Sequence, residues 1–177
     1  MKSRLLALAL LTSTAVHADE VAQQKAARIQ NLYQTGMQAM KSGDRDTARQ
    51  AFQGVLKLQP GHGHARYQLA TLDKNVDRAQ VRLREQKFQT IKLKQVAFDQ
   101  AGMAEALEAL DRMAGEASDG SFTPNFILQD PGKKFDDVRI TLQLRNVPVS
   151  VVLHYILQMS KGTVRYDEHA TVVMPRP

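Results

Sequence analysis

Residues 139–148 read Arg-Ile-Thr-Leu-Gln-Leu-Arg-Asn-Val-Pro, and this stretch decides the fold of the C-terminal half of the chain. Ile140, Leu142 and Leu144 alternate with polar residues, which predicts a strand with one buried face. Pro148 suits the first turn of a helix. The apolar residues that follow recur at the spacing of one helix face: Val149, Val152, Leu153, Ile156 and Leu157. The stretch therefore predicts a strand that leads directly into a helix.

The residues before this stretch predict another strand, a helix and a short strand. Residues 91–98 alternate between apolar and polar side chains, with a change of phase at Lys94-Gln95 that predicts a bulge or bend. A helix follows, with its apolar residues on one face: Met103, Ala106, Leu107, Leu110, Met113 and Ala114. Residues 115–120 end this helix, and Phe126 and Leu128 indicate a strand.

Two strands are expected to close the chain. Lys161-Gly162 ends the second helix, and residues 164–166 and 171–174 form strands. The order of elements over residues 89–177 is therefore β-α-β-β-α-β-β. We expect two helices packed on one face of a small mixed sheet, in a chain of the α+β class.

Residues 89–177 resemble the short N-terminal (STN) domain of secretins and TonB-dependent receptors. Residues 140–148 are similar to that family's strand-to-helix signature, in which valine or isoleucine, threonine and leucine precede asparagine, valine and proline. Val96-Ala97-Phe98 leading into Ala104-Glu105-Ala106-Leu107, and the closing Val172-Val173-Met174-Pro175, add to the likeness. Residues 114–124 depart from it, because they are longer and more polar than a tight connection.

The resemblance implies a role in the periplasm through contacts between proteins. In secretins the domain docks inner-membrane machinery, and in receptors it passes a signal to a membrane-bound regulator. An exposed edge strand of a small sheet would suit this role, because it offers unpaired backbone N–H and C=O groups to a partner strand.

Residues 19–88 are rich in helix-forming side chains and predict three helices, at about 21–41, 45–58 and 63–87. Gly43 marks a tight turn, and Asp44 can cap the second helix by accepting a backbone N–H. Pro60-Gly61 ends that helix. The region is expected to form a helical hairpin followed by one long capping helix.

This region resembles a tetratricopeptide (TPR) repeat. The matching small, turn, aromatic and proline positions are Gly36, Gly43, Ala48, Phe52 and Pro60. The resemblance implies a partner-binding face formed by Tyr33, Met37, Lys41 and Tyr67. Met and Tyr at helical spacing are also typical of a packed core, so both interpretations are open.

Residues 74–94 carry seven basic side chains and two acidic ones. Arg78 and Arg82 lie four residues apart and share one helix face, which could meet an acidic partner surface or anionic lipid headgroups. A solvated helix face explains the same pattern. Nucleic-acid binding is disfavoured, because Phe88 is the only nearby aromatic side chain.

Residues 1–18 have the pattern of a secretory signal peptide, with cleavage expected after Ala18. Lys2 and Arg4 precede a seven-residue apolar run, which is too short to span a bilayer. Loss of this segment would lower the formal charge from +6 to +4. We expect a periplasmic mature chain without a transmembrane span.

The composition offers little catalytic chemistry. The chain has no cysteine, which excludes disulfides, thiolate nucleophiles and cysteine-bound metals. His62 and His64 flank Gly63, with no further ligand at a suitable spacing, and no nucleophile motif accompanies His154. We expect no enzyme, no cofactor and no metal.

The sequence is best interpreted as a periplasmic adaptor without enzymatic activity, an accessory component of an envelope assembly. That assembly would be a secretin-based secretion system, a type IV pilus system or a TonB-linked signalling pathway. Its partners would be a secretin, a TonB-dependent receptor or an inner-membrane component, and the chain could also form homo-oligomers. The alternative is a protein that binds a small ligand or glycan in a crevice between the two halves.

Overall fold

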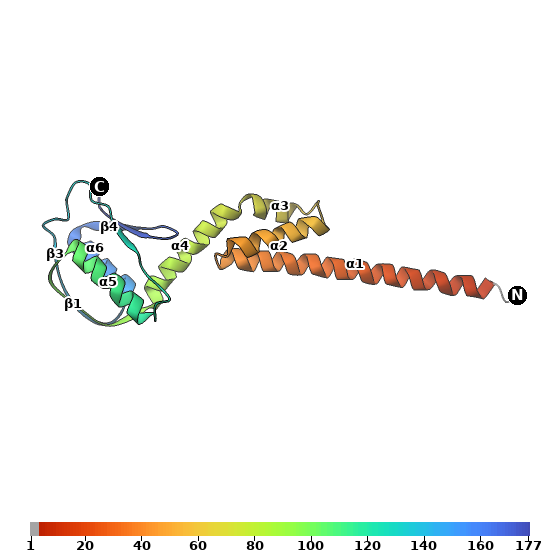
Figure 1. Cartoon of the computed structure of the whole chain (residues 1–177), viewed down its shortest axis with the longest axis horizontal. Coiled ribbons are helices and arrows are strands. Elements are labelled where there is room, and N and C mark those ends of the chain that lie inside the picture. The colour runs from red at the N-terminus through yellow and green to blue at the C-terminus, as the bar shows by residue number, and fades with distance from the viewer. Residues whose placement is uncertain (1–3) are drawn as a thin grey trace. The chain divides into compact units, whose positions relative to one another are not determined.

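A computed structural model describes the backbone of residues 4–177 and the side chains of residues 19–177. The side chains of the predicted signal peptide, residues 1–18, lie outside this description. The chain divides into two compact units, Met1–Ala79 and Gln80–Pro177. The first contains only helices and the second mixes helices with strands, which confirms the α+β class (Figure 1).

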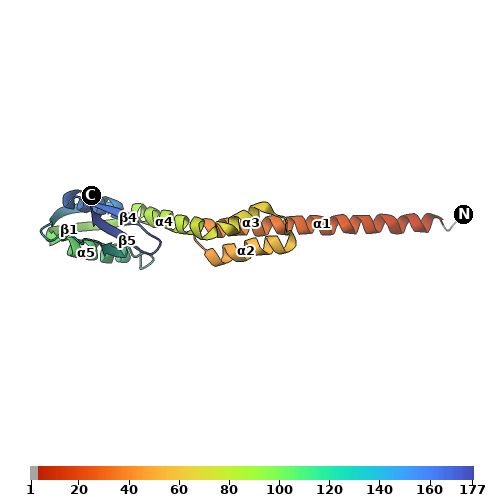
Figure 2. The same ribbon diagram turned by 90° about the horizontal axis from the view of Figure 1, so that it is seen from above.

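The helical unit begins with a hairpin of α1 (Arg4–Lys41) and α2 (Arg45–Leu58), with α2 running back along α1 (Figure 2). Gly43 takes a φ of 79° in the turn. The Asp44 carboxylate accepts the Thr47 backbone N–H at 3.0 Å, so this residue caps α2. That backbone hydrogen bond, together with one from the Thr47 side chain, holds the pKa of Asp44 below its usual range.

The predicted helix over residues 63–87 is in fact two helices, α3 (Gly63–Ala70) and α4 (Leu72–Thr90). The break falls at Thr71, whose hydroxyl donates to the Tyr67 carbonyl and accepts from the Asn75 amide. Threonine can hold its neighbours' backbone in this way and so compete with a continuous helix. The break starts α4 with Leu72 buried in the core of the unit.

The core of the helical unit forms where α1 crosses α2. Phe52 is fully buried there, together with Ala48 and Val55 of the same helix face. Gly36 of α1 lies directly against the Phe52 ring, and a Cβ atom on Gly36 would lie 2.7 Å from Cε1 of that ring. The absence of a side chain at residue 36 therefore sets how closely the two helices approach.

The second unit contains the predicted elements in the predicted order. They are β1 (Lys92–Gly102), α5 (Met103–Ala117), β2 (Phe126–Leu128), β3 (Arg139–Pro148), α6 (Val149–Ser160), β4 (Gly162–Tyr166) and β5 (Thr171–Pro175). Every one of these elements was predicted from the sequence pattern, although the ends of several helices and strands differ by a few residues.

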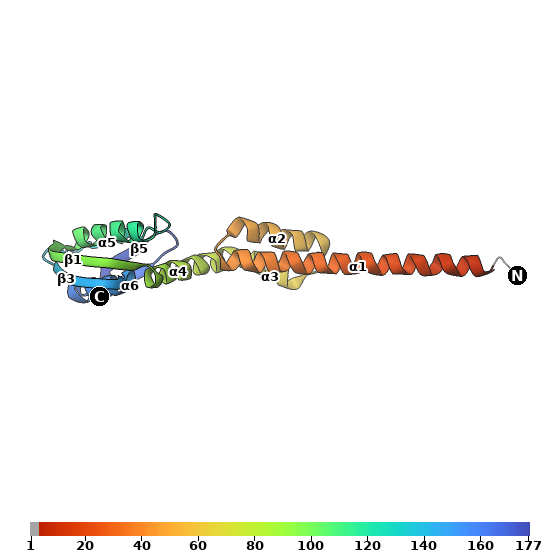
Figure 3. The same cartoon turned by 90° about the horizontal axis from the view of Figure 1, so that it is seen from below.

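The prediction of one mixed sheet is wrong, because the strands form two sheets. β1 pairs with β3 in an antiparallel sheet of two strands, while the order in the other sheet is β2-β5-β4. α5 and α6 contact each other, and each contacts strands of both sheets (Figures 1 and 3). Because α6 contacts strands of both sheets, more of its largely apolar surface is buried than a single sheet would bury.

The prediction of a bulge at Lys94-Gln95 is wrong, because the structure has its β1 bulge between Phe98 and Ala101. The pairing of β1 with β3 keeps one register from Lys92 to Phe98 and shifts between Phe98 and Ala101. Gln100 has a φ of 53° in this bulge, and its backbone N–H donates to the Thr141 hydroxyl. Near Lys94 the alternation of buried and exposed side chains does change phase, but no extra residue interrupts the pairing of β1 with β3 there.

Phe88, near the end of α4, belongs to the core of the second unit and is fully buried. The units divide at residues 79/80, earlier than the predicted boundary at 88/89. The last part of α4 therefore folds with the mixed unit, because it supplies a core side chain to it.

Replacement of Gly36 by alanine should destabilise the helical unit. The added methyl group would press on a buried ring that cannot swing away, and overpacking of this kind costs about 1–3 kcal/mol. Gly115→Ala is the matched control, because nothing lies within 4 Å of its Cβ position in α5. That control should gain about 0.5–1 kcal/mol from helix propensity. Urea unfolding followed by circular dichroism measures both, and a stabilised Gly36→Ala variant would contradict the packing described.

Candidate protein-binding surfaces

Two of the six residues predicted to bind a partner contribute to the helical core. The Tyr33 ring lies 5.8 Å from the Phe52 ring and 5.4 Å from the His62 ring, measured between centroids. Met37 packs against the same apolar cluster while remaining partly exposed. These side chains therefore stabilise the hairpin, as the core interpretation of their spacing predicts.

The other four residues are exposed. Lys41 lies in the last turn of α1, and the side chain of Tyr67 on α3 is 64 % exposed. Arg78 and Arg82 lie on α4 and are also exposed. The structure therefore leaves these four side chains accessible to a partner.

A hollow of about 350 Å³ opens between α1 and the turn that leads into α3. Its lining is mostly apolar and includes Ile29, Tyr33, His62 and His64. Nδ1 of His62 accepts the Ala65 backbone N–H at 3.1 Å, so this imidazole caps α3. The sequence does not predict this role, because histidine is not among the usual capping residues.

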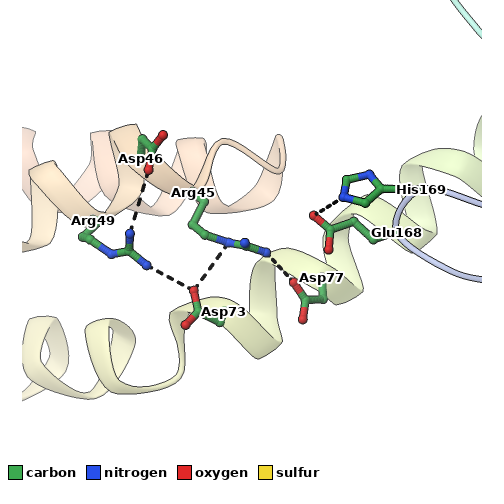
Figure 4. Close-up of polar contacts among 7 residues, drawn as sticks. All are labelled: Arg45, Asp46, Arg49, Asp73, Asp77, Glu168 and His169. Atoms are coloured by element: carbon green, nitrogen blue, oxygen red, sulfur yellow. Dashed lines mark hydrogen bonds and ion pairs between the residues drawn. The ribbon is translucent and has the colours of Figure 1, made fainter.

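Ion pairs join α2 to the first turns of α4, as Figure 4 shows. Arg45 bonds to Asp77 at 2.6 Å, and Asp73 lies 3.4 Å from Arg45 and 3.2 Å from Arg49. Figure 4 also shows a separate contact in the second unit, where Nε2 of His169 lies 3.4 Å from a Glu168 oxygen. The exposed pairs contribute little stability individually, but together they connect α2 to the first turns of α4.

The Phe88 ring organises the second unit around three other aromatic rings. Centroid distances are 5.3 Å to Phe122, 5.9 Å to Phe126 and 5.2 Å to Tyr166, all with tilted or edge-on geometry. Aromatic pairs of this geometry gain about 0.5–1.5 kcal/mol each beyond their burial. Phe88 therefore packs against both outer strands of the three-stranded sheet, through Phe126 of β2 and Tyr166 of β4.

Arg84, one helical turn before Phe88, fixes the loops on the same side. Its guanidinium donates to the carbonyls of Pro124 at 2.9 Å, Thr123 at 3.3 Å and Glu168 at 3.2 Å. Partial burial lowers the pKa of this arginine. The basic stretch over residues 74–94 is thus not uniformly a solvated face, because Arg84 binds backbone within its own unit.

The three-stranded sheet ends at an open edge formed by β2. In the order β2-β5-β4, β2 has β5 on one side only. The pairing is parallel, with Phe126 opposite Thr171 and Leu128 opposite Val173. Ile127, between the two, has a side chain that is 49 % exposed.

A groove runs along this open edge, between β2 and α5. It consists of two adjoining hollows of about 270 and 460 Å³ that share Ala104 and Leu128. Apolar side chains line it (Met103, Leu107, Phe126, Leu128 and Phe135), and carboxylates surround them (Glu105, Glu108, Asp111, Asp130 and Asp136). We call these two hollows together the β2 groove.

The β2 groove was not predicted from the sequence. Glu105, Glu108 and Asp111 recur every third residue on the polar side of a predicted helix, which was a usable signal. The other side of the groove comes from residues 125–136, and no local pattern shows that this segment lies beside that helix.

Neither a metal centre nor a membrane-spanning helix is found in the part of the chain that the structure describes. No three side chains among its His, Asp and Glu residues lie close enough together to hold a metal ion. No described helix is both long enough and apolar enough to cross a bilayer.

Comparisons of the chain with protein-family models, curated proteins and solved structures found no match.

Replacement of Arg84 by methionine should destabilise the second unit, because three carbonyls lose a charged donor. Hydrogen bonds to charged groups contribute about 1.5–3 kcal/mol. Arg84→Lys should recover only part of the loss, since a single ammonium cannot reproduce the guanidinium fork. Arg82→Met is the control on the same helix and should stay within about 0.5 kcal/mol of the unaltered chain. Equal urea midpoints for Arg84→Met and Arg82→Met would refute this role.

The second unit should lose stability at alkaline pH through Tyr166. Burial, and then the charge of Glu85, raise the pKa of this phenol above its ordinary value of 10.0. The stability that the neutral phenol contributes to the folded state is fully present below pH 10. It is lost as the pH rises through the folded-state pKa. The urea midpoint should therefore fall less between pH 9 and pH 11 in Tyr166→Phe than in the unaltered chain. An equal fall in both proteins would contradict this assignment.

Proposed function

We propose that this chain is a periplasmic adaptor without enzymatic activity, which joins proteins of an envelope assembly through the mixed second unit. The observation that carries the proposal is the open edge of β2 beside a largely apolar groove. Edge strands with free backbone groups are normally covered or charged unless they serve to bind, because they otherwise promote aggregation.

The resemblance of residues 89–177 to the STN domain supports the same role. The order β-α-β-β-α-β-β, expected from that stretch, is the order of elements in the structure. In the STN family this domain contacts inner-membrane machinery or a signalling regulator. We infer that the partner here is a secretin, a TonB-dependent receptor or an inner-membrane component.

The helical unit would provide a second contact surface, as the resemblance of residues 19–88 to a tetratricopeptide repeat suggests. Its accessible candidates are Lys41, Tyr67 and Arg78, while Arg82 lies on the part of α4 assigned to the second unit. Tyrosine and arginine are enriched at protein interfaces. An adaptor needs two contacts, and these residues are the exposed ones of the predicted set.

The predicted signal peptide supports export. A fusion of residues 1–18 to a reporter that is active only in the periplasm should give activity, and a fusion starting at residue 19 should not. Reporter activity from both fusions, or from neither, would contradict the proposed location.

Affinity capture from envelope extracts tests the proposed function. The full chain, tagged at its C-terminus, should recover a secretin, a TonB-dependent receptor or an inner-membrane component after crosslinking in intact cells. An unrelated exported protein with the same tag is the control bait. Recovery of none of these classes would contradict the adaptor role, and a glycan or small molecule that copurifies with the chain would favour the alternative of a ligand-binding protein.

A further inference from the structure

We infer that the β2 groove binds an extended protein segment in which lysine or arginine alternates with apolar residues, and that this segment adds to β2 as a fourth strand. The inference rests on the proposed function and specifies the partner's chemistry.

The backbone of β2 defines how a strand would be added. The Asn125 carbonyl accepts from the Thr171 N–H, and the Gln129 N–H donates to the Val173 carbonyl, so residues 125 and 129 face β5. Backbone groups of alternate residues point to opposite sides of a strand. The N–H and C=O groups of Phe126 and Leu128 therefore point to the open edge.

The apolar lining of the groove requires apolar side chains in the bound segment. Phe126 and Leu128 are only partly buried, and with Leu107 and Phe135 they form the base of the groove. An added strand would direct every second side chain toward α5 and this base. Apolar residues at those positions would cover surface that is now exposed.

Charge selects the side chains at the remaining positions. These positions point away from α5, but lysine and arginine have long apolar stems that bring their charged ends back to the carboxylates of the groove. Five carboxylates line the two hollows, against one guanidinium, that of Arg112. The ion pairs within this unit join Arg165 to Asp167 and His169 to Glu168, so none of the five has a cationic partner among the side chains of residues 19–177. Such a groove repels nucleic acid and anionic lipid and attracts a cationic segment.

The chain itself supplies no free segment of this chemistry within the described residues. Its own alternation of cationic and apolar side chains, residues 91–94, lies at the start of β1. Lys92 and Leu93 are paired with Pro148 and Val147 of β3. Leu93 is buried in the core of this unit, so a second copy could turn this segment into the groove only by opening its own core, and the occupant that fits is a different protein.

Titration of the full chain with synthetic octapeptides tests the inference. An alternating Lys-Val peptide should bind, and a Glu-Val peptide should not. A Lys-Val peptide whose alternate backbone nitrogens are methylated should bind at least about tenfold more weakly, because it cannot complete the ladder. Amide exchange of Phe126 and Leu128 should slow when the Lys-Val peptide is bound.

Charge reversals locate the site. Glu108→Lys on α5 and Asp136→Lys in the turn before β3 should each weaken Lys-Val binding about fivefold to tenfold. Asp99→Lys is the matched control, since Asp99 is an exposed carboxylate on β1, outside the groove, and it should leave the affinity within about twofold. Circular dichroism confirms that each variant is folded.

Four results would overturn the inference: no Lys-Val binding, equal binding of both charge types, no protection of Phe126 and Leu128, or equal loss in Asp99→Lys. Self-association of the unaltered chain that Glu108→Lys abolishes would overturn it too, since the occupant would then be a second copy. Capture of an envelope protein that persists in Glu108→Lys would leave the adaptor role standing while refuting this groove as its site.

Discussion

The burial of Phe88 is the interaction on which the mixed unit depends. Without cysteine, this unit has no covalent cross-link, and its stability must come from packing. One ring from α4 contacts Phe122 of the loop, Phe126 of β2 and Tyr166 of β4. The position of the open sheet edge therefore follows from a core contact made by a helix that begins in the other unit.

Along β2 the same residues belong to the core and line the proposed binding groove. Phe126 and Leu128 pack against the core, yet both remain partly exposed in the groove. The strand is three residues long, which limits its tendency to pair with unrelated edges. In the proposed complex the carboxylates of the groove would add selectivity, because they disfavour acidic segments that could otherwise form the same backbone hydrogen bonds.

The parts of the fold that could be predicted are those fixed by local pattern. Alternation at residues 140–144, the turn at Gly43 and the cap at Asp44 each reflect chemistry within a few residues. The division into two sheets depends on the parallel pairing of β2 with β5, some forty-five residues apart, for which the sequence carries no local signal. The break at Thr71 was not predicted, because a single threonine competes only weakly with the helix propensity of its neighbours. The contacts of Arg84 were not predicted, because they join residues 39 to 84 positions apart.

The proposed contact with a partner lies at the β2 edge. Site-specific photocrosslinking in intact cells tests it most directly, with the photoreactive residue placed at Ala104, which is exposed in both hollows of the groove. The same residue at Ala97, exposed on β1 and outside the groove, is the control. We expect an adduct with an envelope protein from position 104 and none from position 97; adducts from position 97 alone would contradict a partner contact at the β2 edge.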